Sequence, residues 1–370
     1  MSFREHLAGL PLDALLAVAR GADAVAVERA LGAERLDLFD FAALLAPAAE
    51  AHLEAMAERA HRITVQRFGR VVQLYAPLYV SNECVQSCTY CGFSRENAVR
   101  RRTLTVDEAV AEARLLREAG FRHLLVVSGE HPRHVSADYL AEILARLHAE
   151  IPSLTVEVQP ATVEIYRKWV AAGAEGLTVY QETYDREVYR EVHLAGKKRD
   201  YDWRLETPER GGLGGMKRLG IGALLGLADW RLEAVHLAAH SSYLMHRFWR
   251  AFVSVSVPRL RKAAFAIAPR RPVSDRDLVR LVCALRIFLP DVGITLSTRE
   301  SPRFRDGILP LGVTLMSAGS RTEPGGYTAP DATEKQFEVE DPRTPAEVAA
   351  AIRQHGYDPV WKDWEAVLNG

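Results

Sequence analysis

From about residue 71 onward, short apolar segments alternate along the chain with amphipathic helical segments. Parallel strands need a helical crossover between them, so this alternation predicts an α/β fold with a parallel sheet. Eight strands within about 250 residues fit a (β/α)8 barrel of the TIM type, and a doubly wound open sheet is the alternative. The predicted strands are Val71–Val80, His123–Val127, Leu154–Val158, Gly176–Tyr180, Ile221–Leu225, Phe252–Val257, Gly293–Leu296 and Gly312–Met316.

The segments on either side of this alternation have a different pattern. Residues 1–70 show leucine and valine at near-helical spacing, and the stretch Phe41–Arg62 is rich in alanine with few helix breakers, so helices are predicted here. We therefore expect an N-terminal helical extension over 1–70 and the barrel over 71–320. A C-terminal extension over 321–370, which contains a predicted helix at Pro345–Gln354, is expected to pack on the barrel.

Composition excludes several classes of protein. Hydrophobic residues make up 48% of the 370 residues and charged residues 26%, which excludes wholesale disorder. A net charge of −1, from 47 basic and 48 acidic residues, argues against a nucleic-acid partner. No apolar run is long enough to span a membrane, and the N-terminus lacks the pattern of a signal peptide, so we expect a cytoplasmic protein.

Polar side chains follow most of the predicted strands. In a parallel barrel the carboxyl ends of all strands meet at one mouth, which is where active sites lie. Polar turns would explain any one of these positions, but their recurrence favours an active-site mouth. The positions are Asn82, Ser128-Gly129-Glu130, Gln159, Gln181-Glu182, Ser256, Ser297-Thr298-Arg299 and Ser317-Ala318-Gly319-Ser320.

Three of the four cysteines, Cys84, Cys88 and Cys91, follow the first predicted strand directly. Thiolates this close on one loop can converge on a metal centre. Iron–sulfur clusters normally take four thiolates, so three would leave one iron open to an exogenous ligand. The pattern therefore favours a 4Fe–4S cluster with an open iron at the barrel mouth.

Two other interpretations of the cysteines remain open. A structural zinc ion would need a fourth protein ligand, but Cys283 lies in an apolar helical segment typical of a packed thiol. His131 and His134 lie in a loop and resemble surface histidines. A redox-active pair would need only two cysteines.

The segment Asn82–Phe93 resembles the cluster loop of the radical S-adenosylmethionine (SAM) superfamily. The resemblance implies that Cys84, Cys88 and Cys91 bind the 4Fe–4S cluster and that SAM chelates the open iron. It also implies that Tyr90 packs near the adenine. In that superfamily the reduced cluster cleaves SAM to methionine and a 5′-deoxyadenosyl radical.

Other strand ends resemble SAM-binding elements of the same superfamily. Ser128-Gly129-Glu130 is similar to a Gly-Gly-Glu element whose backbone meets the methionyl amino group. Arg204 is similar to an arginine that pairs with the SAM carboxylate, and a guanidinium suits that task through its bidentate geometry. The cofactor-binding residues that the resemblance implies are Tyr90, Gly129, Glu130, Gln159, Glu182, Arg204 and Gly222.

Two late segments resemble the aromatic amino acid lyase branch and, within it, the 2-iminoacetate synthase family. They are Ser-Thr-Arg-Glu-Ser-Pro from Ser297, and Ser-Ala-Gly-Ser from Ser317 with the following Pro-Gly-Gly-Tyr. The resemblance implies cleavage of the Cα–Cβ bond of L-tyrosine to 2-iminoacetate (dehydroglycine) and p-cresol, for thiamine thiazole biosynthesis. Arg299 would hold the tyrosine carboxylate, helped by Ser317 or Ser320. An Arg299–Glu300 network that only braces the barrel rim is the structural alternative.

The resemblance also implies partners. A reduced flavodoxin- or ferredoxin-type donor would supply the electron, and a thiazole synthase would receive the product, in a complex with this chain. No cysteine follows Cys283, so we expect no second cluster of the kind found in the related tyrosine lyase of hydrogenase maturation. Tryptophan lyase or deazaflavin-synthase chemistry is the enzymatic alternative, and a zinc-stabilised binding module is the non-enzymatic one.

Overall fold

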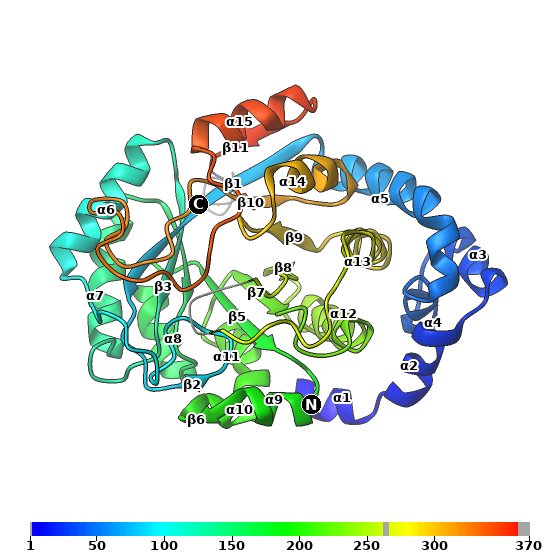
Figure 1. Ribbon diagram of the computed structural model, residues 1–370, viewed down its shortest axis with the longest axis horizontal. Helices are drawn as coiled ribbons and strands as arrows, with labels where there is room; N and C mark the ends of the chain where they lie inside the picture. Colours follow the sequence, from blue (N-terminus) through cyan, green and yellow to red (C-terminus); the bar gives the residue numbers. More distant parts are fainter. Residues whose placement is uncertain (1, 262–265, 362–370) are drawn as a thin grey trace.

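The computed structural model, which describes residues 2–261 and 266–361, shows a closed ring of eight parallel strands surrounded by helices (Figure 1). Each strand pairs in parallel with the next, and β10 pairs back onto β1 at Gln73 and Leu315. This closure confirms the (β/α)8 barrel and excludes the open sheet. The strands are β1 (Val71–Ser81), β3 (His123–Ser128), β4 (Ser153–Glu157), β5 (Gly176–Glu182), β7 (Arg218–Ala223), β8 (Phe252–Ser256), β9 (Gly293–Leu296) and β10 (Leu315–Ser317).

Helices cross between the strands on the outside of the ring. Several begin at a hydroxyl side chain that accepts a backbone N–H of the first turn, as Thr105, Ser136 and Ser274 do. The outer helices are α6 (Val106–Glu118), α7 (Ala137–His148), α8 (Val163–Ala171), α11 (Thr207–Leu213), α12 (Trp230–Arg247), α13 (Asp275–Phe288) and α14 (Pro302–Ile308), with the short helices α9 (Arg186–Val192), α10 (Tyr201–Leu205), η2 (Lys197–Arg199) and η3 (Leu309–Leu311).

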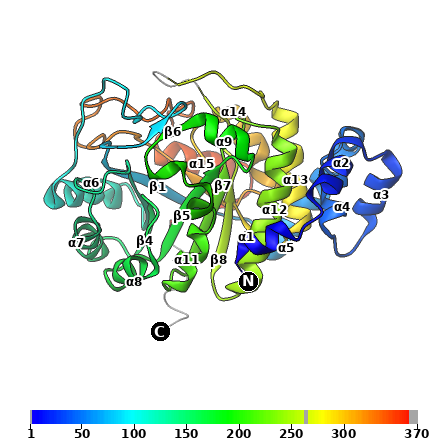
Figure 2. The ribbon, with the colours of Figure 1, turned by 90° about the horizontal axis from the view of Figure 1, so that it is seen from below.

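The N-terminal helices form an arc outside α12 and α13 (Figures 1 and 2). These helices lie within the residues 1–70 for which the sequence predicts them, and within Phe41–Arg62 the chain changes from α4 to a 3-10 turn at Pro47, which has no N–H to continue a helix. Arg231 and Arg280 anchor the arc by donating to the carbonyl oxygens of Leu45 (3.0 Å) and Ala46 (2.9 Å). The helices are α1 (Phe3–Ala8), α2 (Leu12–Gly21), α3 (Ala24–Gly32), α4 (Leu38–Ala43), η1 (Pro47–His52) and α5 (Leu53–Phe68).

Two strands begin three residues away from their predicted starts, and the other boundaries differ by at most two residues. β7 begins at Arg218 rather than Ile221, because the guanidinium is buried inside the barrel and donates to Gln73 Oε1 (2.8 Å). β10 begins at Leu315 rather than Gly312, since Gly312 has a φ of 153° and lies in a turn. Hydrophobicity alone cannot reveal a buried arginine that extends a strand.

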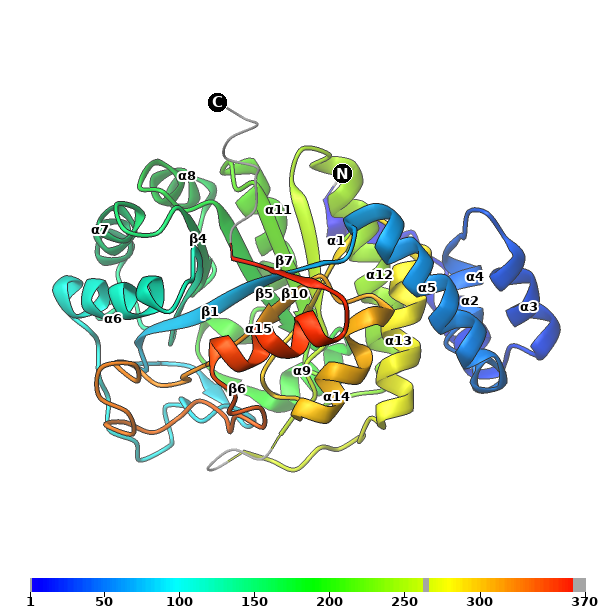
Figure 3. The same cartoon turned by 90° about the horizontal axis from the view of Figure 1, so that it is seen from above.

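The chain after the barrel returns to its first strand. Helix α15 (Pro345–Gln354) occupies the residues that the sequence pattern predicts. Strand β11 (Asp358–Val360) follows it and runs parallel to the start of β1 (Figure 3), which the sequence did not indicate. Residues 362–370 of the expected C-terminal extension lie outside the described residues. Among the described residues, no helix is long and apolar enough to cross a membrane.

A buried ion pair ties the segment after β10 to the barrel. Arg305 in α14 and Asp341 are both fully buried, and the Arg305 guanidinium donates to the Asp341 carboxylate and to the carbonyl oxygen of Ser317 in β10. Arg343 also donates to Asp341, at 2.7 Å. The pair therefore fixes the end of β10, at the barrel mouth.

We predict that Asp341→Ala lowers the free energy of unfolding by about 3–5 kcal/mol, because it leaves a buried guanidinium without its counterion. Urea denaturation of the variant measures the loss. Asp291→Ala, which removes the partner of Arg67 in an exposed pair, is the control and should cost at most about 1 kcal/mol. Equal effects of the two substitutions would show that the buried pair does not stabilise the fold.

Candidate functional site

The cysteine loop between β1 and α6 is organised around one arginine. The Arg101 guanidinium donates to four backbone carbonyl oxygens of the loop at 2.7–3.3 Å. Ser94 Oγ accepts the backbone N–H of Cys88 at 3.1 Å. An extended loop without regular structure has its polar backbone groups satisfied in this way. The four carbonyl groups are those of Asn82, Phe93, Ser94 and Asn97.

A small antiparallel sheet docks this loop onto the chain that follows β5. Strand β2 (Ser87–Cys88) pairs with β6 (His193–Ala195), and neither strand was apparent from the sequence. The Nδ1–H of His193 donates to the Tyr189 carbonyl oxygen (2.9 Å), so Nε2 is left to accept the Tyr90 hydroxyl (2.7 Å). Burial lowers the pKa of His193 to about 3, which keeps the imidazole neutral. Tyr90 is thereby held in one orientation beside the cysteines.

The three thiols lie on one largely buried loop. Burial raises the pKa of each thiol, and at Cys84 and Cys88 the charges of neighbouring cysteines act in the same direction, so that the pKa of Cys84 is about 12. Sulfurs around one tetrahedral zinc lie about 3.8 Å apart, given a Zn–S bond of about 2.3 Å. Among the described residues, no group of three metal-ligand atoms within 4.8 Å includes these sulfurs. Cys283 is buried separately in α13.

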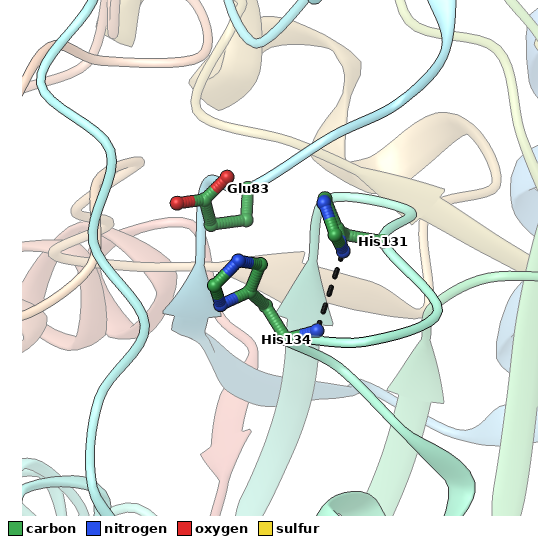
Figure 4. A group of neighbouring side chains, drawn as sticks. All are labelled: Glu83, His131 and His134. Atoms are coloured by element: carbon green, nitrogen blue, oxygen red, sulfur yellow. Dashed lines mark hydrogen bonds between the residues drawn. The ribbon is translucent and has the colours of Figure 1, made fainter.

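His131 and His134 lie next to Glu83 of the cysteine loop (Figure 4). Their ligand atoms lie within 4.8 Å of one another, a spacing that a divalent ion could bridge. However, His131 Nδ1 already accepts the backbone N–H groups of Arg133 and His134, both at 3.3 Å. The group therefore serves as a contact between two loops, separate from the three cysteines.

A cavity at the carboxyl ends of the strands, the mouth cavity, brings together residues from distant parts of the sequence. Its wall includes side chains from the cysteine loop, from β5 and from the ends of β9 and β10. Six residues singled out in the sequence line it: Tyr90, Cys91, Glu182, Arg299, Ser317 and Ser320.

Four charged side chains of alternating sign form a network beside this cavity, whose wall includes two of them, Glu182 and Lys198. Arg204 pairs with Glu130 (3.0 Å) and with Glu182 (3.6 Å), and Lys198 pairs with Glu182 (2.8 Å). Burial opposes ionisation of Glu182, yet the charges of Lys198 and Arg204 lower its pKa to about 2. Glu182 follows a bulge in β5 and has a φ of 71°, an uncommon left-handed conformation that is typical of functional sites.

Arg299 reaches the cavity without a counterion. Glu300 pairs instead with Arg259 and with Arg261 (2.6 Å), so the Arg299–Glu300 rim network is wrong. The Arg299 guanidinium lies 3.4 Å from the centre of the Phe337 ring. Within the described part of the chain it has no ion pair or side-chain hydrogen bond, and burial lowers its pKa.

The two serines at the end of β10 differ in their contacts. Ser317 Oγ accepts the backbone N–H of Thr298 at 3.1 Å. Ser320 Oγ is buried without a hydrogen-bond partner in the described residues. Buried polar atoms are rarely left unpaired in proteins, so Ser320 and Arg299 together indicate a site for an anionic ligand group.

Comparisons with known proteins agree with this geometry. Residues 78–236 match the radical SAM superfamily, and residues 256–358 match the biotin and thiamin synthesis associated domain. The chain is 44% identical to the 2-iminoacetate synthase of Escherichia coli K12 over 99% of its own length and 98% of that protein. It is 43% identical to the same enzyme of Salmonella typhimurium, with equal coverage.

The chain belongs to the 2-iminoacetate synthase family of radical SAM enzymes.

A solved structure supports the assignment of the fold. The crystal structure of HydG, a maturase of the FeFe-hydrogenase, is 33% identical to the chain, with a TM-score of 0.88 over 95% of this chain and 79% of that chain. Radical SAM enzymes use a 4Fe–4S cluster and SAM. Members of the 2-iminoacetate synthase family are radical SAM lyases.

The described residues fit both cofactors. Three thiols on one largely buried loop suit a cluster with one open iron, and thiolate–iron bonds would offset the burial that raises their pKa. The alternating charges of Glu130, Arg204, Glu182 and Lys198 match a ligand that carries a carboxylate and an ammonium group.

Of the seven residues expected at SAM, only Tyr90 and Glu182 line the mouth cavity. Glu130, Gln159 and Arg204 line a neighbouring cavity together with Lys198, and Gln159 donates to the Val135 carbonyl oxygen (2.8 Å). Gly129 and Gly222 line neither of these two cavities. A Cβ on Gly222 would lie 2.4 Å from the carbonyl oxygen of Ser256 and 2.8 Å from the Tyr180 ring. Packing within the barrel therefore explains this glycine, and its role in binding SAM stays a prediction.

Several cavity residues were missed by reasoning from the sequence. Glu157 is the last residue of β4, inside a run predicted as a buried strand. Lys198 lies in a Lys-Lys-Arg run that resembles an exposed turn. Gln336 and Phe337 come from the segment after the barrel, and Gln336 Nε2 approaches Cys91 Sγ at 3.7 Å. Of these residues, only Glu157 could have been found from the sequence, as a polar residue at the end of a strand.

We predict that Gly129→Ala prevents cluster assembly in this family member. A Cβ at this position would lie 2.3 Å from the carbonyl oxygen of Glu83, so the cysteine loop would have to move. Iron and sulfide content after anaerobic reconstitution measures the loss. Gly307→Ala, with no atom within 4 Å of the added Cβ, is the control and should leave the content unchanged. Full cluster content in Gly129→Ala would show that the close contact does not position the loop.

Proposed function

We propose that this chain cleaves the Cα–Cβ bond of L-tyrosine, giving 2-iminoacetate and p-cresol while SAM is converted to methionine and 5′-deoxyadenosine. The observation that carries the proposal is the Arg299 guanidinium, which has no counterion and shares one cavity with Cys91 and Tyr90. Identity of 44% over the full chain to a 2-iminoacetate synthase supports the same reaction.

The residues at the mouth cavity would serve two molecules, SAM and tyrosine, which must meet there. Cys84, Cys88 and Cys91 would hold the cluster, which with bound SAM supplies a 5′-deoxyadenosyl radical as the reactive species. Tyr90 would pack against SAM, as its fixed hydroxyl and buried ring suggest.

The charged residues beside the cavity would bind the amino acid end of SAM. Arg204 and Lys198 offer cations to its carboxylate, while Glu130 and Glu182 offer carboxylates to its ammonium group. Gly129 would contribute its backbone, because the absence of a side chain lets β3 approach the cysteine loop.

The tyrosine carboxylate would be held by Arg299. Ser320 Oγ supplies a second donor and Ser317 a third group from the same strand end. The Phe337 ring lies against the guanidinium in the same cavity wall and would hold it in place for the substrate. Fixed placement matters here, because a radical must react at one N–H of the substrate.

The partners follow from this reaction. An electron donor such as a reduced flavodoxin or ferredoxin would act with the chain in the cytoplasm. The match of residues 256–358 to a domain of biotin and thiamin synthesis supports a thiamine role. We propose that a thiazole synthase takes up the imine in a complex with this chain, since 2-iminoacetate hydrolyses readily in water.

Product analysis with reconstituted enzyme tests the reaction. Reduced enzyme with SAM and tyrosine should form p-cresol and 5′-deoxyadenosine in equal amounts. Tryptophan and phenylalanine serve as alternative substrates under the same conditions. If SAM is cleaved but no p-cresol forms, or if tryptophan yields its fragment instead, the proposal is wrong. Metal analysis that finds one zinc ion and no iron would support the binding-module alternative.

We predict that Arg299→Ala raises the tyrosine concentration needed for half-maximal p-cresol formation by about 10- to 100-fold, since it removes a charge-assisted hydrogen bond. Cleavage of SAM without tyrosine should persist, because the cysteines and the charged network remain. Arg303→Ala, an exposed arginine of α14, is the matched control. Unchanged tyrosine dependence in Arg299→Ala would remove this residue from the substrate site.

We predict that Cys88→Ala abolishes both iron binding and SAM cleavage, because three thiolates are the minimum for a cluster with one open iron. Cys283→Ala, which removes a thiol buried in α13, should keep the iron content of the unaltered chain. Iron analysis and formation of 5′-deoxyadenosine provide the two readouts. Retention of SAM cleavage by Cys88→Ala would contradict the ligand assignment.

A further inference from the structure

The mouth cavity contains a second charged side chain without a partner, the carboxylate of Glu157. Glu157 ends β4 and lines the cavity together with Arg299. The other carboxylate on this wall, Glu182, is already paired with Lys198 and Arg204. In the described part of the chain, the Glu157 carboxylate has no hydrogen bond and no ion pair.

Such a carboxylate is costly unless something compensates for it. Burial, and after it the negative charge of Glu182, raises the pKa of Glu157 to about 7. The charge of Arg299 acts in the opposite direction, so the guanidinium lies close enough to stabilise the ionised form. The cavity thus holds one cation and one anion that are near each other but not bonded to each other.

We propose that Glu157 binds the α-ammonium group of the substrate amino acid while Arg299 binds its carboxylate. This inference rests on the proposed function and adds to it the residue that recognises the reacting nitrogen. An α-amino acid carries a positive and a negative group on one carbon, and the two unpaired side chains complement that pair. Lysine and arginine residues elsewhere on the wall are occupied by Glu182 and Glu130.

Two ionic contacts on one tetrahedral carbon also restrict its remaining bonds. With the carboxylate on Arg299 and the nitrogen on Glu157, the Cα–Cβ bond can turn only about the line that joins these two groups, and the cavity wall around the side chain supplies the third contact. The bond to be cleaved and the N–H to be attacked are then both held before the reaction begins. Glu157 would therefore touch the substrate at the atom where the radical reacts.

A phenol hydroxyl is the other group that could donate to the Glu157 carboxylate. The protein itself has three such hydroxyls nearby, because the Glu157 charge raises the pKa of Tyr75, Tyr79 and Tyr180. These hydroxyls already have partners, as Tyr79 has in Gln336 Oε1 (2.7 Å). A neutral phenol would leave the Glu157 charge uncompensated, whereas an ammonium neutralises it. The ammonium assignment therefore accounts for both unpaired charges.

Binding measurements without turnover can separate these contacts. Reconstituted holoenzyme with SAM and no reductant is titrated with L-tyrosine, 3-(4-hydroxyphenyl)propanoate, tyramine and L-phenylalanine. The second ligand lacks the ammonium group, the third lacks the carboxylate and the fourth lacks the hydroxyl. The variants are Glu157→Gln and Arg299→Gln, and the iron content of each shows that its cluster is assembled.

The expected pattern is specific to each charge. Glu157→Gln should lower the affinity for tyrosine, tyramine and phenylalanine by about 10- to 100-fold, and the affinity for 3-(4-hydroxyphenyl)propanoate should stay unchanged or increase. Arg299→Gln should lower the affinity for tyrosine and for the propanoate and leave the affinity for tyramine unchanged. Glu157→Asp, which keeps the charge, should recover part of the tyrosine affinity.

The affinity of the unaltered enzyme for tyrosine should also rise between about pH 6 and 8. The folded-state pKa of Glu157 is raised to about 7, so the carboxylate needed for the ammonium forms only above that pH, while the substrate ammonium stays protonated. Glu182, Arg299, Arg204 and Lys198 are the other charged groups that act on Glu157, and none of them titrates in this window. The rise should be absent in Glu157→Gln.

Three outcomes would overturn the inference. Glu157→Gln could keep full tyrosine affinity, it could weaken the propanoate as much as tyrosine, or it could spare phenylalanine, which would assign Glu157 to the phenol. If the unaltered enzyme cleaves tyrosine while any of these holds, only this inference fails. If it neither binds nor cleaves tyrosine, the proposed function itself fails.

Discussion

The pairing of β10 with β1 is the constraint on which the site depends. It closes the ring and brings the end of the last barrel strand beside the first, as the bond from the Ala318 N–H to the Tyr75 carbonyl oxygen shows (3.2 Å). The cysteine loop follows β1, and Ser317 and Ser320 lie at and just after the end of β10. Without this closure, residues more than two hundred positions apart in the sequence would not share one cavity.

Electrostatics then separates two groups of charged residues at the mouth. Beside the cavity, Glu130, Arg204, Glu182 and Lys198 neutralise one another in a low-dielectric setting, where pairs of opposite charge interact strongly. In the cavity wall, Arg299 and Glu157 remain unpaired and close together. The paired charges suit a cofactor end that must be bound in a fixed position, and the unpaired charges suit a substrate that arrives and leaves.

The barrel, and the residues that belong to recognisable sequence motifs, could be predicted from the sequence. The spacing of apolar residues and the turns between segments predicted all eight strands, because each apolar run is bounded by a helical crossover or a turn. The cysteines, Arg299 and the serines of β10 follow strand ends and were therefore found. Lys198, Gln336 and Phe337 were missed because their place at the cavity depends on long-range docking of irregular chain. The loop contacts of Arg101 and the bulge at Glu182 are likewise properties of tertiary structure.

Glu157 shows the limit of reading one strand at a time. Its position at the end of β4 was available, but the absence of a partner becomes visible only once Glu182, Lys198 and Arg204 are seen to satisfy one another. The central claim is that the mouth cavity binds a zwitterionic amino acid between Arg299 and Glu157. A crystal structure of reconstituted enzyme with SAM and L-tyrosine tests it most directly. The account predicts the tyrosine carboxylate at Arg299 and its nitrogen at Glu157. Tyrosine bound with these ends reversed, or outside the cavity, would contradict it.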